Sequence, residues 1–231
     1  MSYSEITKKT ASELFDYLNS NILDEEGTIE ITLCGLKVRI DDIDTIGNTL
    51  QTWLKYYLTK ENIYYRVPDS TQIFPDFYLG EEDEENLLEL KAFNYNKTPA
   101  FDVANFASYC DSLILKPYIL FADYIVLGYT MTNGSLKIQK IWKKKVWEIC
   151  STSSKHKLRV QDKKGTIYNI RPCTWYSTRS NASSPFKNKE EFVQAIYETL
   201  KNYTRRHVDA DKWLNDFLKS YENYYGEPFN I

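Results

Sequence analysis

Two carboxylates and a lysine lie close together in the middle of this sequence, in a pattern that suits phosphodiester chemistry. Asp76 follows Pro75 in FPDFYL, and Glu89 and Lys91 lie in NLLELKAF after twelve intervening residues. Side chains alternate along a strand, so Glu89 and Lys91 project from one face while the leucines beside them enter the core. If the strand ending near Asp76 pairs with the strand carrying Glu89, the two carboxylates meet at the edge of a sheet.

Two carboxylates at one point repel each other unless a cation neutralises them, and a hard divalent ion with oxygen ligands suits that task. We therefore expect Mg²⁺, held by Asp76 and Glu89. The ion would lower the pKa of a bound water and offset charge on a phosphodiester, while Lys91 orients the water or stabilises the pentavalent state. The opposing interpretation is a solvated edge strand. A second Pro-Asp pair, Pro68-Asp69, lies in PDSTQ, whose composition is typical of a turn, so Asp76 is preferred.

Hydrophobic spacing predicts the elements that position these residues. Helices are expected at 4–18, 45–59, 98–113, 189–203 and 209–224, the third capped by Thr98 with Pro99 at its first position. Strands are expected at 63–67, 73–79, 87–93, 124–131 and 136–141, with a strand pair at 28–40, a hairpin turn at TNGS and further strand up to residue 150. The pattern indicates an α/β fold with a mixed central sheet flanked by helices.

Length and composition indicate one ordered domain over residues 1–231. The 231 residues are 42% hydrophobic, which is enough for one sizeable core. No stretch has the features of a signal peptide or a membrane span, and the four cysteines are widely separated. We therefore expect an unexported cytoplasmic protein without membrane contact. Within it, a catalytic core covers about 45–131, a DNA-contacting basic region about 132–190, and C-terminal helices about 189–224.

Charge is segregated along the chain, although the net charge is only -3. Residues 1–90 hold 7 basic and 19 acidic residues, whereas residues 91–231 hold 22 basic and 13 acidic residues. Within 137–164 there are 10 Lys or Arg against Glu148 and Asp162 alone, which is typical of a surface that binds a polyanion; an ordinary solvated basic face is the alternative.

The candidates for DNA contact are polar and basic residues of this second part of the chain. Those expected to read bases are Asn94, Asn96, Lys97, Arg171, Arg179 and Asn181. Those expected to contact phosphates are Lys143, Lys144, Lys145, Lys155 and Lys157. Two histidines outside metal or triad spacing, and the absence of GxxxxGK and GxGxxG, argue against histidine-dependent, triad and nucleotide-driven chemistry, so no nucleotide cofactor is expected.

The paired motif resembles the PD-(D/E)XK pattern of type II restriction endonucleases. The element order from Leu50 to Met131 is similar to the core of that superfamily, and the stretches ADYIVLGY, IQKIWKKKVWEI and IYNIRP followed by WYS are similar to its NgoBV and NlaIV group. The resemblance implies a restriction-endonuclease-like core, a homodimer and cleavage of double-stranded DNA at a palindromic GGNNCC site.

The resemblance also implies roles for individual residues. Asp76, Glu89 and the Leu90 carbonyl would bind the metal, and Lys91 would be the catalytic lysine. Many members carry a Glu on the preceding helix, where this chain has Gln51, which puts a second metal's ligand in doubt. Asn105 and Tyr109, four residues apart on one helical face, are further supporting candidates. Two alternatives stay open: a structure-specific repair or recombination nuclease of the same superfamily, and a non-catalytic DNA-binding protein.

Overall fold

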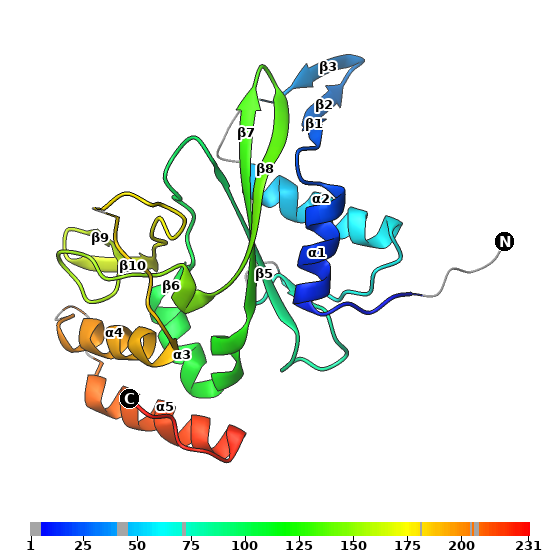
Figure 1. The fold of residues 1–231 in the computed structure, drawn as a ribbon. Coiled ribbons are helices and arrows are strands. Elements are labelled where there is room, and N and C mark those ends of the chain that lie inside the picture. The colour runs from blue at the N-terminus through cyan, green and yellow to red at the C-terminus, as the bar shows by residue number, and fades with distance from the viewer. Residues whose placement is uncertain (1–5, 41–45, 71–72, 181, 204, 206–207) are drawn as a thin grey trace. The chain divides into compact units, whose positions relative to one another are not determined.

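The computed structural model describes residues 6–40, 46–70, 73–180, 182–203, 205 and 208–231 (Figure 1). The chain divides into two compact units. The first comprises residues 1–99 and 122–144, and the second comprises residues 100–121 and 145–231. Both contain helices and strands, which confirms the predicted α/β class. Within the described ranges, each helix is too short or too polar to cross a membrane.

Two helices of the first unit form where apolar residues recur three and four positions apart. Helix α1 (Ala11–Asn21) begins after Thr10, whose hydroxyl accepts from the Glu13 N–H while the Glu13 carboxylate accepts from the Thr10 N–H. This capping box starts the helix at Ala11, later than the predicted start at residue 4, which lies outside the described residues. Helix α2 (Ile46–Lys60) confirms the second predicted helix.

The first unit contains a five-stranded sheet with the strand order β1-β8-β7-β5-β4. The strands are β1 (Glu26–Thr28), β4 (Phe77–Tyr78), β5 (Leu87–Asn94), β7 (Asp123–Thr132) and β8 (Ser135–Lys145). Because β5 pairs antiparallel with β4 and parallel with β7, the sheet is mixed, as predicted. Asn133 and Gly134 join β7 to β8 with φ of 50° and 74°, the positive values that a two-residue hairpin turn requires.

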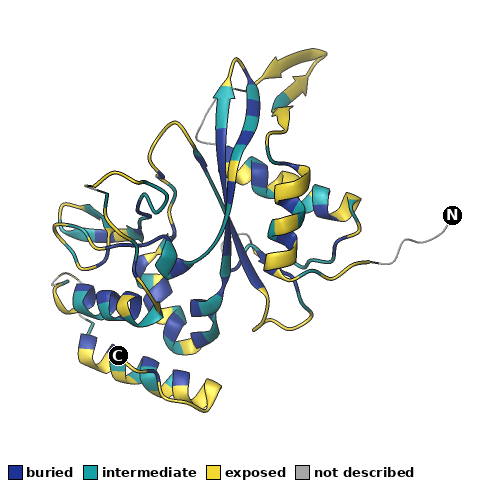
Figure 2. Cartoon of the chain, viewed as in Figure 1, coloured by how far each residue is buried: buried dark blue, intermediate teal, exposed yellow. Residues whose placement is uncertain are grey.

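Helices α1 and α2 lie on the same side of this sheet and form the main core of the first unit with it (Figure 1). Leu88 and Leu90 of β5 enter this core together with the buried leucines of α1 and α2. Glu89 and Lys91 therefore point to the opposite face, because side chains alternate along the strand. Figure 2 shows the central strands as largely buried. A rigid, buried strand thus carries the two charged residues.

A separate two-stranded ribbon also belongs to the first unit. It consists of β2 (Glu30–Leu33) and β3 (Leu36–Arg39), which pair antiparallel around the turn Cys34-Gly35. This confirms the predicted strand pair. Unlike the central sheet, the ribbon is exposed along nearly its whole length, as Figure 2 shows.

The second unit combines helices with a small sheet of order β6-β10-β9. Its elements are β6 (Ala104–Asn105), α3 (Phe106–Leu115), the 3-10 helices η1 (Pro117–Phe121) and η2 (Val146–Glu148), β9 (Val160–Lys163), β10 (Thr166–Ile170), α4 (Lys189–Lys201) and α5 (Ala210–Tyr225). The indole N–H of Trp213 in α5 donates to the Cys110 carbonyl of α3 over 2.9 Å. The two predicted C-terminal helices are confirmed.

Several predicted elements are wrong in extent. Residues 63–67 make only isolated bridges, at Ile63 and Arg66, and within the predicted strand 73–79 the ladder is limited to β4. Prolines at 68 and 75 cannot donate to a ladder, which keeps both segments short. The predicted helix 98–113 begins at Phe106 with Asn105 as N-cap, because residues 104–105 pair with β10 instead. The predicted strand up to residue 150 ends at Lys145, where η2 follows.

Candidate active site

The hairpin β4–β5 places Asp76 opposite Glu89. Phe77 pairs with Leu88 and Tyr78 with Leu87, and the Leu79 N–H donates to the Asn86 carbonyl over 3.0 Å. Continuing this register by one residue brings Asp76 and Glu89 face to face at a position without ladder hydrogen bonds. Such pairs have the closest side chains in an antiparallel sheet. The structure therefore brings the two predicted carboxylates together at the edge of the sheet.

Direct contacts hold Asp76 in this position. Its N–H donates to Glu89 Oε2 over 3.1 Å, and the Leu90 N–H donates to Asp76 Oδ2 over 2.9 Å. The side-chain amide of Gln51, on α2, donates to Asp76 Oδ1. Each Asp76 carboxylate oxygen thus accepts one hydrogen bond, and the helix and the hairpin share in orienting it.

Lys91 lies on the same face of β5 as Glu89 and forms an ion pair with it. The Lys91 Nζ is 2.8 Å from Glu89 Oε1, and both side chains are largely buried, with 19% and 8% of their surface exposed. A second lysine, Lys55 on α2, is half-buried one helical turn after Gln51. The charge of Lys55 is close enough to Asp76 to lower the pKa of that carboxyl.

The electrostatic balance at Asp76 is nevertheless unfavourable to its charge. Burial, followed by repulsion from Glu89, raises the pKa of Asp76 to about 7. The opposing effects of Lys91, the Leu90 N–H and Lys55 are smaller and do not offset this rise. Burial and the neighbouring carboxylate therefore disfavour the charged form of Asp76, which is a condition that a bound divalent cation would relieve.

The donor set also suits a hard cation. In the described part of the chain there is no group of three His, Cys, Asp or Glu side chains that could bind a metal, so two carboxylates need a further oxygen. The Leu90 carbonyl lies on the side of β5 that faces Asp76, because a strand residue points its N–H and C=O to the same side and this N–H reaches Asp76. Pro75 precedes Asp76 and has no N–H with which to occupy that carbonyl. Mg²⁺ in proteins usually has few protein oxygen ligands, and water molecules complete its coordination shell.

The candidates for base reading lie in several places. Asn94 ends β5, and its side chain accepts from the Asn96 N–H over 3.0 Å in a turn that also contains Lys97. In the second unit, Arg171 is paired with Asp102, whereas Arg179 is exposed. Asn181 lies outside the described residues.

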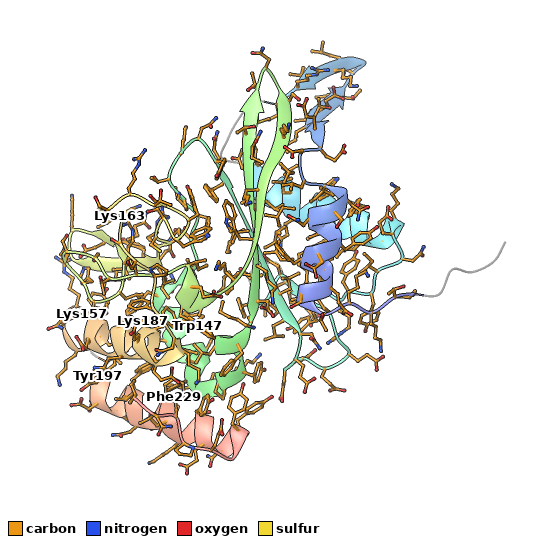
Figure 3. The ribbon with its side chains drawn as sticks, viewed as in Figure 1. Trp147, Lys157, Lys163, Lys187, Tyr197 and Phe229 are labelled. Carbon is orange, nitrogen blue, oxygen red and sulfur yellow. The ribbon has the colours of Figure 1, made fainter. Side chains whose placement is uncertain are left out.

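Most of the candidates for phosphate contact already have partners. The Lys143 Nζ donates to Ser12 Oγ over 2.7 Å, and Lys145 donates to the Phe121 carbonyl. Lys155 lies 2.5 Å from Asp162. Lys157, which is labelled in Figure 3, lies 3.8 Å from Glu198. Lys144 is half-buried on β8. Composition alone does not show these contacts. The ion pairs of Lys155 and Lys157 neutralise part of the positive charge of the basic region.

The three supporting candidates have different environments. Gln51 contacts Asp76 directly. Asn105 caps α3, because its side-chain oxygen accepts from the Ser108 N–H over 3.0 Å, and Tyr109 is buried in the same helix of the second unit. Sequence reasoning missed Lys55. The only signal that could have found it is its spacing of four residues from Gln51, which puts both on one helical face.

A mixed sheet whose edge hairpin presents two carboxylates and a lysine is the architecture of the restriction-endonuclease-like nucleases. The family model "NgoBV restriction endonuclease" matches residues 8–231, so the chain belongs to this family. It is 39% identical over 229 residues to the type II restriction enzyme NlaIV of Neisseria lactamica, covering 97% of this chain and 94% of the relative. It is also 37% identical over 161 residues to the type II restriction enzyme NgoBV of Neisseria gonorrhoeae, covering 68% and 91%.

The solved structure of NlaIV restriction endonuclease has the same fold. It superimposes with a TM-score of 0.92 at 37% sequence identity, over 99% of this chain and 95% of that chain. The resemblance to the NgoBV and NlaIV group is therefore confirmed. The chain is a type II restriction endonuclease, which is a site-specific deoxyribonuclease, and its substrate is DNA. Enzymes of this type generally need a divalent metal ion.

Proposed function

We propose that the chain hydrolyses double-stranded DNA with Mg²⁺ at a palindromic site, GGNNCC by its resemblance to the NgoBV and NlaIV group. Asp76, Glu89 and Lys91 are its catalytic residues. The observation that carries this proposal is the pairing of Asp76 with Glu89 on the β4–β5 edge, where burial and repulsion raise the pKa of Asp76 to about 7. Both units of the chain serve this one endonuclease.

Each residue of the site has a separate role in the reaction. Asp76, Glu89 and the Leu90 carbonyl hold the ion, and the Gln51 amide keeps one Asp76 oxygen oriented. When bound, Mg²⁺ lowers the pKa of a coordinated water and offsets charge on the phosphate. Lys91, held on a rigid strand 2.8 Å from Glu89, orients the attacking water and stabilises the additional negative charge of the pentavalent state.

The remaining candidates position the DNA. Asn94, Asn96, Lys97, Arg171, Arg179 and Asn181 read bases, and Lys143, Lys144, Lys145, Lys155 and Lys157 contact phosphates. Lys143, Lys155 and Lys157 have the internal anionic partners Asp123, Asp162 and Glu198, so a phosphate contact by any of these lysines would exchange one anion for another. Their individual contributions to DNA binding are therefore modest compared with those of the catalytic residues.

The enzyme acts as a homodimer, because a two-fold symmetric site is cut on both strands by two symmetric active sites. The exposed ribbon supports this assembly. Ile31, Leu33, Leu36 and Val38 share one face and are 55%, 71%, 67% and 45% exposed. The other face carries Glu30, which pairs with Lys37 and Arg39. An apolar face without charge suits a second copy of itself rather than a polyanion.

A matched pair of ribbon variants tests the dimer. The double variant Leu33→Lys, Leu36→Lys places charge on the apolar face and is expected to be monomeric by light scattering. Thr32→Lys adds charge to the opposite face and is expected to stay dimeric. A double variant that remains a dimer would show that the ribbon is not the interface.

The decisive experiment for the function is digestion of a mapped plasmid with and without Mg²⁺, followed by sequencing of the ends. Fragments with ends at GGNNCC are expected. Asp76→Ala and Lys91→Ala should each lower the cleavage rate by about a thousandfold or more while DNA binding persists. Full activity in either variant would contradict the site assignment, and cleavage at other sequences would contradict only the proposed recognition site.

A further inference from the structure

Lys55 has a position that the catalytic assignment does not use. It follows Gln51 by four residues on α2, so the two side chains lie on one face of the helix, about 6 Å apart along its axis. The Gln51 amide contacts Asp76, which shows that this face of α2 borders the carboxylates. Lys55 is half-buried, between the buried stripe of Leu50, Leu54 and Leu58 and solvent.

Lys55 forms no ion pair within the described part of the chain. Across the described ranges, no carboxylate oxygen lies within 4.0 Å of its Nζ. By contrast, Lys91 pairs with Glu89 at 2.8 Å, and Lys155 pairs with Asp162 at 2.5 Å. A partly buried ammonium group without an anion has lost hydration and gained no ion pair. Such a group is suited to receive an anion that the protein does not itself supply.

Electrostatics agrees with this placement. The positive charge of Lys55 lowers the pKa of Asp76, so it acts at the metal-binding edge from the helix side. Lys91 acts on the same carboxyl from the strand side. An anion that approaches the carboxylates along the hairpin edge would therefore have a cation on each side.

We propose that Lys55 binds a backbone phosphate of the DNA beside the bond that is cut. This inference rests on the proposed function, since DNA must lie across the β4–β5 edge for its phosphates to reach α2. The phosphodiester backbone supplies one negative charge per nucleotide, so a second phosphate follows directly after the one at the metal site. Lys55 would then fix the register of the strand relative to the carboxylates, while Lys91 serves the reacting phosphate.

The test compares two lysines of the same helix. Lys60, at the end of α2, has 78% of its side chain exposed and pairs with Glu61 at 3.4 Å, so Lys60→Ala removes the same charge away from the site. We expect Lys55→Ala to lower kcat/KM by about tenfold to a hundredfold, the range for a charge-assisted contact, and Lys60→Ala to leave it within about twofold. Lys55→Arg should retain most of the activity because it keeps the charge.

A salt titration separates phosphate binding from a structural role. Fluorescence anisotropy would measure binding of a short duplex with one mapped cleavage site, in a Lys91→Ala background that does not cut it. Adding Lys55→Ala should reduce the slope of log affinity against log salt by about 1, whereas Lys60→Ala should leave the slope unchanged. Equal slopes for the two variants would overturn the inference. Failure of the wild-type protein to cut DNA would instead contradict the proposed function. The two slopes would then be compared on a duplex that contains GGNNCC, so the measurement would still test Lys55.

Discussion

The β4–β5 edge and the segment around Asp162 both gather charged side chains, but they arrange them in opposite ways. At the edge, Asp76 faces a second carboxylate, and burial together with Glu89 raises the pKa of Asp76 to about 7. Asp162 Oδ2 lies 2.5 Å from the Lys155 ammonium and 2.9 Å from the His156 ring, and its Oδ1 accepts from the Gly165 N–H over 2.7 Å. These partners hold the pKa of Asp162 far below its usual range.

The difference separates charge that stabilises the fold from charge kept for a ligand. Folding stabilises the charged form of Asp162, because the folded chain brings the Lys155 ammonium, the His156 ring and the Gly165 N–H to it. Without a bound ligand, folding destabilises the charged form of Asp76, because this form is buried beside Glu89. Proteins retain such unfavourable groups mainly at functional sites. The comparison therefore assigns the chemistry to the acidic edge and a stabilising role to Asp162.

Neutralising Asp76 should stabilise the metal-free protein while abolishing its activity. We expect Asp76→Asn to raise the free energy of unfolding at pH 8 by about 1–3 kcal/mol. The difference between the pKa of Asp76 in the folded and in the unfolded protein sets an upper limit of about 4 kcal/mol. The asparagine amide cannot accept from both Gln51 and the Leu90 N–H, which reduces the gain. Chemical denaturation in EDTA measures it, and equal or lower stability of the variant would contradict the assigned electrostatics.

The difference in stability between wild type and Asp76→Asn should depend on pH. Between about pH 4 and pH 7 the folded wild-type protein retains a proton on Asp76 that the unfolded chain has released. The unfolded state binds fewer protons there, so this contribution to wild-type stability falls as pH rises through the window. The difference between variant and wild type should therefore grow from pH 4 to pH 7 and then level off. Mg²⁺ should reverse the order at pH 8 by stabilising only the wild type.

A third carboxylate beside Asp76 and Glu89 should lower the stability of the metal-free protein, whereas neutralising Asp76 should raise it. Gln51→Glu removes the hydrogen bond to Asp76 and adds a negative charge beside two carboxylates that are already buried together. We expect a loss of about 1–2 kcal/mol in metal-free stability at pH 8 and tighter binding of Mg²⁺. Thermal unfolding over a Mg²⁺ titration measures both effects. Gln51→Leu, which removes the hydrogen bond without adding charge, is the control and should not tighten metal binding.

Local pattern was sufficient to predict the hairpin and its charges. The two-residue periodicity of NLLELKAF predicts that Glu89 and Lys91 share a face, and the structure shows this arrangement. Long-range pairing was not predictable in the same way. The helix expected to start after Thr98 begins at Phe106, because Ala104 pairs with Ile170, a residue 66 positions further along the chain.

Charge composition was less informative than charge pairing. The ten basic residues of 137–164 predict a polyanion-binding surface, but Lys155 and Lys143 have internal partners that no count of residues reveals. Lys55, in the acidic first part of the chain, was overlooked for the complementary reason. Its significance comes from α2 packing beside the hairpin, which brings together residues 21 positions apart.

The smallest expected effect lies at Asp162. Asp162→Asn keeps an acceptor for the Gly165 N–H but removes the charge that faces Lys155 and His156, so the variant should be less stable than wild type at pH 7. Because the folded-state pKa of Asp162 is depressed, its contribution is present above about pH 4 and is lost as pH falls below that value. The two proteins should therefore converge in acid, as wild type and Asp76→Asn also should, but the sign at neutral pH is opposite: Asp162→Asn is less stable than wild type there, whereas Asp76→Asn is more stable. Cleavage at neutral pH should change little, and a large loss of activity without a loss of stability would show that this segment takes part in the chemistry after all.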